Sequence, residues 1–154
     1  DMTDDQKFDL YYGYAFNDLC QSFYTRLDFV TTFVQLVGGS GAAAGVLASS
    51  PVLVAFSGVV LAICAAISIT VQPSIKAYKH EIAKCAFWEV RQRAISSIDG
   101  VALEGAIAQA QASSPMGINT LEDPAFNRTL EMLGYSTGAV PLGCRQRCLK
   151  AMAL

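Results

Sequence analysis

The absence of charge from the centre of the chain is the feature that most restricts its fold. No Asp, Glu, Lys or Arg lies between Asp28 and Lys76, although the 154 residues include 11 basic and 13 acidic side chains. A water-soluble surface carries charged groups throughout, because Lys, Glu, Arg and Asp are the residues least often buried. The uncharged stretch therefore indicates either a protein core or the interior of a lipid bilayer.

A turn signal divides the uncharged stretch near its middle. Residues 49–51 read Ser-Ser-Pro, and the proline can begin a new helix. The flanking segments, 29–48 and 52–72, each have the roughly 20 residues that a helix needs to cross about 30 Å of hydrocarbon. A helix satisfies its own backbone hydrogen bonds in lipid, and the alternation typical of a membrane barrel is missing here. The sequence therefore predicts a hairpin of two transmembrane helices, in which the Gly- and Ala-rich first span inserts together with the second.

The charges that flank the two spans set the expected orientation, and the turn between the spans has none. The positive-inside rule places both termini in the cytoplasm, and we expect the bacterial inner (cytoplasmic) membrane. The basic residues that fix this orientation are Arg26 before the first span and Lys76, Lys79 and Lys84 after the second.

Apolar residues recur every three or four positions on both sides of the hairpin, which predicts amphipathic helices. The first helix covers 4–28, is capped by Thr3 or Asp4, and can run into the first span without a break. The second covers 74–98 and is its natural antiparallel partner. One face of this second helix contains Ile75, Tyr78, Ile82, Cys85 and Glu89. A neighbouring face contains Phe87, Val90, Ala94 and Ile98.

The sequence predicts a hairpin domain, 4–98, followed by a small C-terminal region, 99–154. Three short helices are expected in this region. They cover 101–112, then a segment with Asp123 as cap that ends at Gly134, then 143–154. The last is basic and amphipathic, so it either lies on the inner membrane face or is a frayed terminus. The fold class is thus all-α.

Small residues form one stripe on each span, where they permit close helix packing in lipid. Two interpretations stand: the stripes face each other inside one hairpin, or they join neighbouring protomers of a homo-oligomer. The stripes are Gly41, Gly45 and Ser49 on the first span, and Gly58, Ala62 and Ala66 on the second.

Few polar side chains lie within the spans. Gln35, Ser40 and Ser68 are candidates to line a pore. Alternatively, the hydroxyls bond their own helix backbone and Gln35 bonds a neighbouring helix. The lack of an ionisable residue within the spans argues against a proton-coupled pump, a voltage sensor and an ion-based transporter.

Residues for site chemistry are also scarce, so we expect no enzymatic activity, no cofactor and no metal. The formal net charge of −2, without a basic stripe, argues against nucleic-acid binding. The glycine run lacks the Gly-Lys-Ser/Thr of a phosphate-binding loop. The single histidine, His80, is expected on an exposed helix face, and Cys144 and Cys148 lack the second pair that a zinc site requires.

The order of these parts resembles the SLATT family of two-transmembrane effectors in bacterial and phage conflict. The likeness covers about residues 16–100 and depends on the segments 23–27 (FYTRL), 49–51 (SSP) and 78–81 (YKHE). The resemblance implies a homo-oligomeric pore former that is controlled by a partner, often one that responds to a nucleotide second messenger. Since this chain shows no appended sensor domain, the trigger would come from a separate sensor protein or from the C-terminal region.

Two other functions are compatible with the sequence. A phage holin or superinfection-exclusion protein would have the same membrane hairpin. A soluble all-helical structural or interaction oligomer with a very apolar core would account for the uncharged stretch without a membrane.

Overall fold

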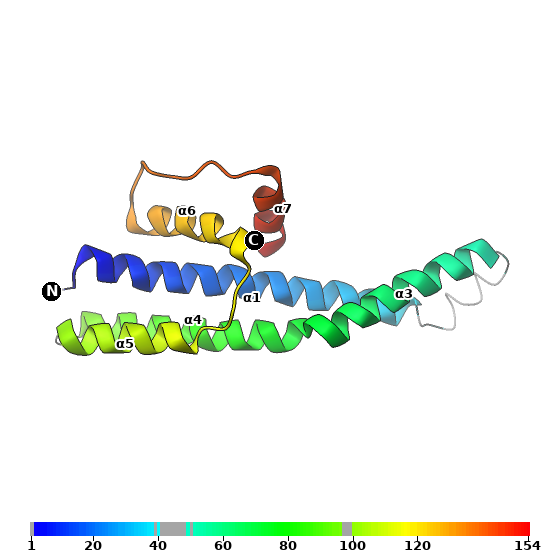
Figure 1. The fold of residues 1–154 in the computed structure, drawn as a ribbon, viewed down its shortest axis with the longest axis horizontal. Coiled ribbons are helices and arrows are strands. Elements are labelled where there is room, and N and C mark those ends of the chain that lie inside the picture. Colours follow the sequence, from blue (N-terminus) through cyan, green and yellow to red (C-terminus); the bar gives the residue numbers. More distant parts are fainter. Residues whose placement is uncertain (1, 39, 41–48, 50, 97–99) are drawn as a thin grey trace. The chain divides into compact units, whose positions relative to one another are not determined.

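The computed structural model describes residues 2–38, 40, 49, 51–96 and 100–154, and for 53, 100 and 101 it describes the backbone alone. These residues contain helices and no strand, which confirms the all-α class. The elements are α1 (Asp4–Gly38), α3 (Pro51–Val71), α4 (Pro73–Ile95), α5 (Gly100–Ser113), the 3₁₀ helix η1 (Asn119–Leu121), α6 (Glu122–Leu133) and α7 (Cys144–Ala153) (Figure 1).

The ends of the helices follow from local sequence signals. Thr3 caps α1 as predicted: its Oγ1 accepts the backbone N–H of Gln6 at 3.2 Å, and Gln6 Oε1 accepts the N–H of Thr3 at 3.0 Å. Pro51 begins α3, and α6 ends at Gly134, which adopts the left-handed φ of 81° that favours glycine.

The predicted start of α6, with Asp123 as its cap, lies two residues too late. The helix begins at Glu122, directly after η1, and its N-cap is Leu121. Asp123 therefore lies in the first turn, where a carboxylate interacts favourably with the helix dipole. Its Oδ2 accepts a hydrogen bond from Nε2 of Gln146, which ties α6 to α7.

The chain forms two compact units, and α1 contributes to both. The first unit, called the head below, consists of residues 1–23 and 77–154, and the second, the apolar hairpin, consists of 24–76. The predicted domain boundary at 98–99 falls outside the described residues. In the head, α5, α6 and α7 belong to the same unit as the start of α1.

The core of the head lies on two sides of α1. On one side, Leu10 packs with residues of α4 and α5, among them Phe87 and Ile107. On the other side, Leu19 and Cys20 pack with residues of η1, α6 and α7. The N-terminal part of α1 is thus enclosed by the pair α4–α5 and by α6–α7 (Figure 1).

Two glycines permit the closest contacts in this core. A Cβ on Gly13 would lie 2.3 Å from the ring of Phe87, and a Cβ on Gly117 would lie 2.3 Å from the ring of Phe16. Any larger residue at either position would displace an aromatic ring.

His80 is buried in the head, so its predicted surface position is wrong. Its exposed fraction is 0%, and its Nδ1 lies 2.8 Å from Oδ1 of Asn17. Since an amide oxygen only accepts, Nδ1 carries the hydrogen. The Asn17 amide nitrogen donates to the Gly13 carbonyl at 2.8 Å and to Ser114 Oγ at 3.1 Å, which joins α1, α4 and the segment after α5.

An ion cluster centred on Asp18 joins three helices beside this network. Oδ1 of Asp18 lies 3.2 Å from Nζ of Lys84 on α4, and Oδ2 lies 2.8 Å from the guanidinium of Arg128 on α6. All three side chains are largely buried, so removal of one partner would leave an uncompensated charge.

We predict that Gly13→Ala destabilises the head, because the added methyl group overlaps Phe87. Overpacking of this kind costs about 1–3 kcal/mol. The matched control is Gly105→Ala on α5, where a Cβ would meet no described atom within 4 Å. That change should be neutral or stabilise the helix by up to about 1 kcal/mol. Thermal unfolding that ranks the two variants in the opposite order would contradict this packing.

The Cys20 thiol should be unreactive in the folded protein. Burial raises its pKa from 9.0 to about 11, so the thiol stays protonated near neutral pH. Alkylation followed by mass spectrometry should modify the exposed Cys85, Cys144 and Cys148 first and Cys20 only upon unfolding.

The same shift gives Cys20 a pH-dependent effect on stability. A folded-state pKa above the unfolded value means that the stabilisation is complete below about pH 9 and is lost as the pH rises toward about 11. Cys20→Ala should lower stability at pH 7 but remove this part of the alkaline loss. An unchanged alkaline profile in the variant would refute the assignment.

Candidate functional site

The apolar hairpin is the part of the molecule that departs most from a soluble fold. It contains the end of α1, all of α3 and the first residues of α4. α3 carries no charged residue. The arrangement of its polar and apolar side chains is therefore the feature to examine.

Two polar side chains of the hairpin, Gln35 and Thr31, are bonded to protein groups. Nε2 of Gln35 on α1 donates to Oγ of Ser68 on α3 at 3.1 Å. Thr31 is 2% exposed, and its Oγ1 donates to the carbonyl of Leu27 at 2.9 Å. A hydrogen bond between helices is stable in lipid because the alternative is an unsatisfied polar group.

Hydroxyls elsewhere in the hairpin bond their own helix. Ser40 Oγ donates to the Val37 carbonyl and Ser57 Oγ donates to the Val54 carbonyl, each at 2.9 Å. Of the three candidate pore-lining residues, Gln35 and Ser68 are thus bonded to each other, and Ser40 is bonded to backbone. This agrees with the alternative reading of these residues, and a lining role in an oligomer stays a prediction.

α1 and α3 approach each other closely at Gly38. A Cβ at this position would lie 2.5 Å from Cδ2 of Leu61, so only glycine admits that leucine. Small residues at a helix contact are how helices pack closely in lipid.

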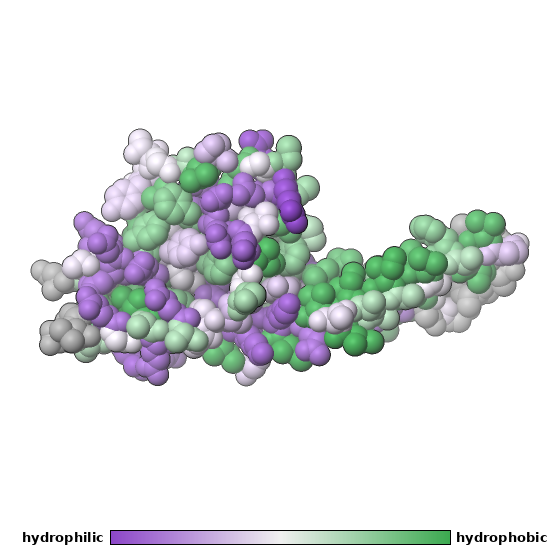
Figure 2. All heavy atoms as spheres, in the orientation of Figure 1, coloured by the Kyte–Doolittle hydropathy of each residue, from purple (hydrophilic) through white to green (hydrophobic). Residues whose placement is uncertain are grey.

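The large apolar side chains of the hairpin point away from its interior. Phe29 and Phe56 are 68% and 67% exposed, and Leu36 is 70% exposed. Figure 2 shows the hydrophobic surface gathered over α3, while the hydrophilic surface lies mainly over elements of the head. The other exposed apolar residues here include Val30, Phe33, Val37, Val52, Val54, Val59, Ile63 and Ile69.

Such a surface is unusual for a monomer in water. Contiguous exposed apolar patches mark protein–protein or membrane interaction sites, and scattered single residues do not. Here apolar groups face outward along two helices, and the hydrogen bond of Gln35 with Ser68 lies between them.

The structure describes the two predicted small-residue stripes to different extents. Gly41 and Gly45 lie outside the described residues, and Ser49 is exposed. Gly58, Ala62 and Ala66 lie on an exposed face of α3, and a Cβ at Gly58 would meet no described atom within 4 Å. Within one chain this second stripe therefore does not pack against α1, and its role between protomers stays a prediction.

The residues that the sequence predicts to set the orientation occupy distinct environments. Nζ of Lys76 lies 5.4 Å from the ring centre of the buried Tyr24, within cation–π range. Arg26 and Lys79 are exposed, whereas Lys84 is bonded to Asp18 and Gln21 in the head.

Sequence reasoning named Gln35 and Ser68 separately and missed their contact, and it missed the contact of Tyr24 with Lys76. A hairpin places residues at similar distances from its turn level with each other. Both pairs lie at similar sequence distances on either side of Pro51, so this symmetry was the available signal.

The cysteines form no site in the described structure. All five are free thiols, and Cys144 and Cys148 are exposed on α7. Groups of three or more His, Cys, Asp or Glu that could hold a metal ion are absent from the described part of the chain.

One described helical stretch, Val54–Ile95, is long and apolar enough to cross a membrane by its length and composition. Its best window has a mean hydropathy of 2.4, and none of that window is buried. It contains most of the second predicted span. The first span, 29–48, falls partly outside the described residues, so a two-span hairpin stays a prediction.

Comparison of the chain with protein-family models, with curated proteins and with solved structures found no match. The function must therefore be inferred from the chain itself.

We predict that Gln35 and Ser68 are energetically coupled. In a double-mutant cycle with Gln35→Leu and Ser68→Ala, the coupling energy should be about 0.5–1.5 kcal/mol in detergent micelles. Ser57→Ala, which removes a hydroxyl bonded to its own helix, should show no coupling to Gln35→Leu. Additive unfolding energies for the first pair would mean that α1 and α3 do not meet at this level.

Proposed function

We propose that the chain is a homo-oligomeric membrane protein whose apolar hairpin enters the bilayer and permeabilises it. The single observation that carries this proposal is the outward orientation of the large apolar side chains of the hairpin, while Gln35 and Ser68 bond each other between its helices. In water this surface would be costly at about 25 cal/mol per Å² of exposed apolar area, whereas acyl chains solvate it.

In this proposal both segments, 29–48 and 52–72, span the membrane and both termini are cytoplasmic. The lack of charge from residue 29 to residue 75 supports spanning, because a charged residue at the helix centre costs about 2.5–3.5 kcal/mol on insertion scales. Lys76 beside Tyr24 is suited to the cytoplasmic interface, where amphipathic aromatic rings and basic side chains are enriched.

Permeation requires several copies. Two helices bonded to each other through Gln35 and Ser68 enclose no path of their own, so ions would pass between protomers. The exposed stripe of Gly58, Ala62 and Ala66 supports close contact between hairpins. A conflict role of the SLATT type, with a separate sensor protein as trigger, is part of this proposal and depends on the sequence resemblance alone.

The test uses the full-length protein and phospholipid vesicles loaded with a self-quenched dye. We predict that the protein floats with the vesicles and releases the dye. Ile63→Lys, at an exposed position in the middle of α3, should reduce both insertion and release about tenfold or more, because it places a charge among the acyl chains.

The matched control is Met116→Lys, which changes an exposed apolar residue of the head in the same way. It should insert and release dye like the unmodified protein. Protein that stays in the supernatant without detergent would favour the soluble oligomer and overturn the proposal. Insertion without release would refute permeabilisation and leave the membrane location standing.

A further inference from the structure

α7 is a folded part of the head rather than a frayed terminus. Ala153 is 3% exposed and belongs to the core cluster that contains Leu19 and Cys20 of α1, and Leu149 packs against the same cluster. An amphipathic helix that lies in a membrane surface buries its apolar face among the lipids. In α7 that face is occupied by the head, so any contact with a partner must use the opposite face.

The opposite face of α7 is exposed and positively charged. Cys144 and Cys148 lie on the far side of the helix from the buried Ala153, because a helix has 3.6 residues per turn. Arg147 lies on one side of these thiols and Arg145 on the other, and all four side chains are exposed. We call Cys144, Arg145, Arg147 and Cys148 the α7 face.

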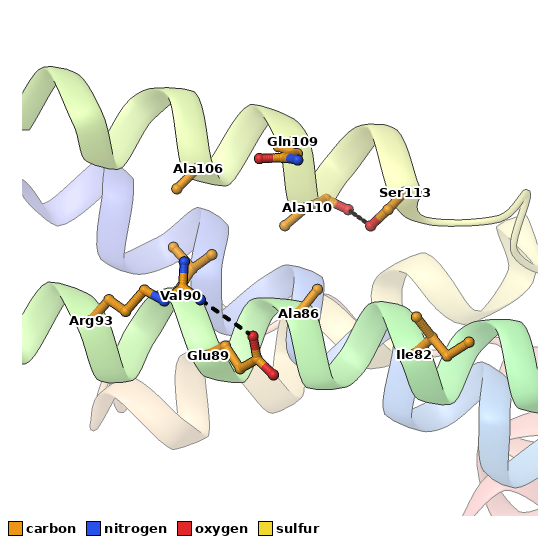
Figure 3. Close-up of a pocket in the computed structure, with 9 residues that line it drawn as sticks. All are labelled: Ile82, Ala86, Glu89, Val90, Arg93, Ala106, Gln109, Ala110 and Ser113. Carbon is orange, nitrogen blue, oxygen red and sulfur yellow. Dashed lines mark hydrogen bonds and ion pairs between the residues drawn. The ribbon is translucent and has the colours of Figure 1, made fainter.

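The arginines of the α7 face differ from most basic residues elsewhere in the head. Four of those pair with carboxylates: Lys7, Lys84, Arg93 and Arg128. Figure 3 shows one such pair, in which Arg93 lies 3.8 Å from Glu89 on the rim of a groove between α4 and α5. Among the residues that the structure describes, neither Arg145 nor Arg147 forms an ion pair. Their charge is therefore available to a partner.

The distribution of charge along the sequence points to an anionic partner. Residues 132–154 contain three basic residues and no acidic one, which gives a formal charge of +3. Residues 1–131 contain the other 8 basic residues and all 13 acidic ones, which gives −5. A positive segment on an otherwise negative chain attracts an anionic surface locally, although the chain as a whole does not.

The place where α7 meets α1 favours lipid headgroups as this partner. α7 packs at Leu19 and Cys20, and α1 continues as one helix to residue 29, where the proposed first span begins. Nine residues of helix rise at most about 14 Å toward the hydrocarbon, and headgroups occupy roughly the last 5–7 Å of that distance. The remaining distance is about one Debye length at physiological salt, so the field of an anionic leaflet reaches this contact.

We propose that the α7 face binds anionic lipid headgroups at the cytoplasmic surface of the membrane. This rests on the proposed function, because the hairpin brings α7 to the bilayer and so raises the local concentration of phosphate groups. A guanidinium group binds phosphate through paired hydrogen bonds. Because Arg145 and Arg147 flank Cys144 and Cys148, lipid bound at the arginines covers both thiols.

This cover gives a direct test with the full-length protein in phospholipid vesicles. One sample contains phosphatidylcholine alone, and the other also contains phosphatidylglycerol. A bulky uncharged maleimide should alkylate Cys144 and Cys148 about tenfold more slowly in the anionic vesicles. The exposed Cys85 on α4 is the control in the same molecules and should react alike in both. Salt at about 1 M shortens the Debye length to roughly 3 Å and should remove the difference. Equal rates at Cys144 and Cys148 in the two lipids overturn the proposal.

Two charge-reversal variants test the arginines themselves. Arg145→Glu/Arg147→Glu should abolish the difference in rate between the two lipids. Lys7→Glu/Arg93→Glu makes the same change of charge at two exposed residues outside α7 and should keep that difference. Thermal unfolding checks that the head of each variant is folded. Loss of the difference in both folded variants would mean that the overall charge of the protein decides, and would refute the α7 face.

The lipid contact and the proposed function fail in different experiments. Dye release with equal alkylation in the two lipids leaves permeabilisation standing and overturns the contact. Slow alkylation in anionic vesicles without dye release supports the contact and refutes permeabilisation. Protection of Cys144 and Cys148 in native membranes but not in vesicles of pure lipid would assign the α7 face to an acidic protein, and would also overturn the lipid contact.

Discussion

The lack of charge from residue 29 to residue 75 is the constraint on which the rest of the structure depends. It leaves residues 29–75 without a charged side chain that could form an ion pair, and the contacts described between α1 and α3 there are van der Waals packing and a hydrogen bond. Gly38 admits Leu61, and Gln35 bonds Ser68. The head is held by an apolar core that includes Leu10, Phe87 and Leu19, and by the ion cluster around Asp18. One chain thus combines a unit suited to water with a unit whose exterior is apolar.

Local sequence signals predict where several of the helices begin and end. Pro51, Gly134 and the Thr3–Gln6 capping pair mark helix ends, and each acts through the geometry of its own few residues. The two faces of α4 could also be predicted from the sequence, because apolar spacing depends only on the helical repeat. The sequence did not predict which face would be buried, since that choice depends on where α1 and α5 pack.

The position of His80 shows the limit of such reasoning. Its neighbours Lys79 and Glu81 are charged, which made the segment look exposed. On a helix, however, adjacent residues point in different directions, and His80 shares its face with Ala83 and Phe87. In its buried position it is bonded to Asn17, far away in the sequence, which supplies an acceptor. In the hairpin, the contact of Gln35 with Ser68 was open to inference from symmetry about the turn, whereas the outward direction of the second small-residue stripe required coordinates.

The burial of His80 also makes it a natural spectroscopic reporter. Because the chain has one histidine, its imidazole ring gives a single set of signals in a nuclear magnetic resonance spectrum. The ring hydrogen on Nδ1 is held by Asn17, whose amide also binds Gly13 and Ser114. Its exchange with solvent therefore reads out, at one atom, whether α1, α4 and the segment after α5 remain joined when lipid vesicles are added.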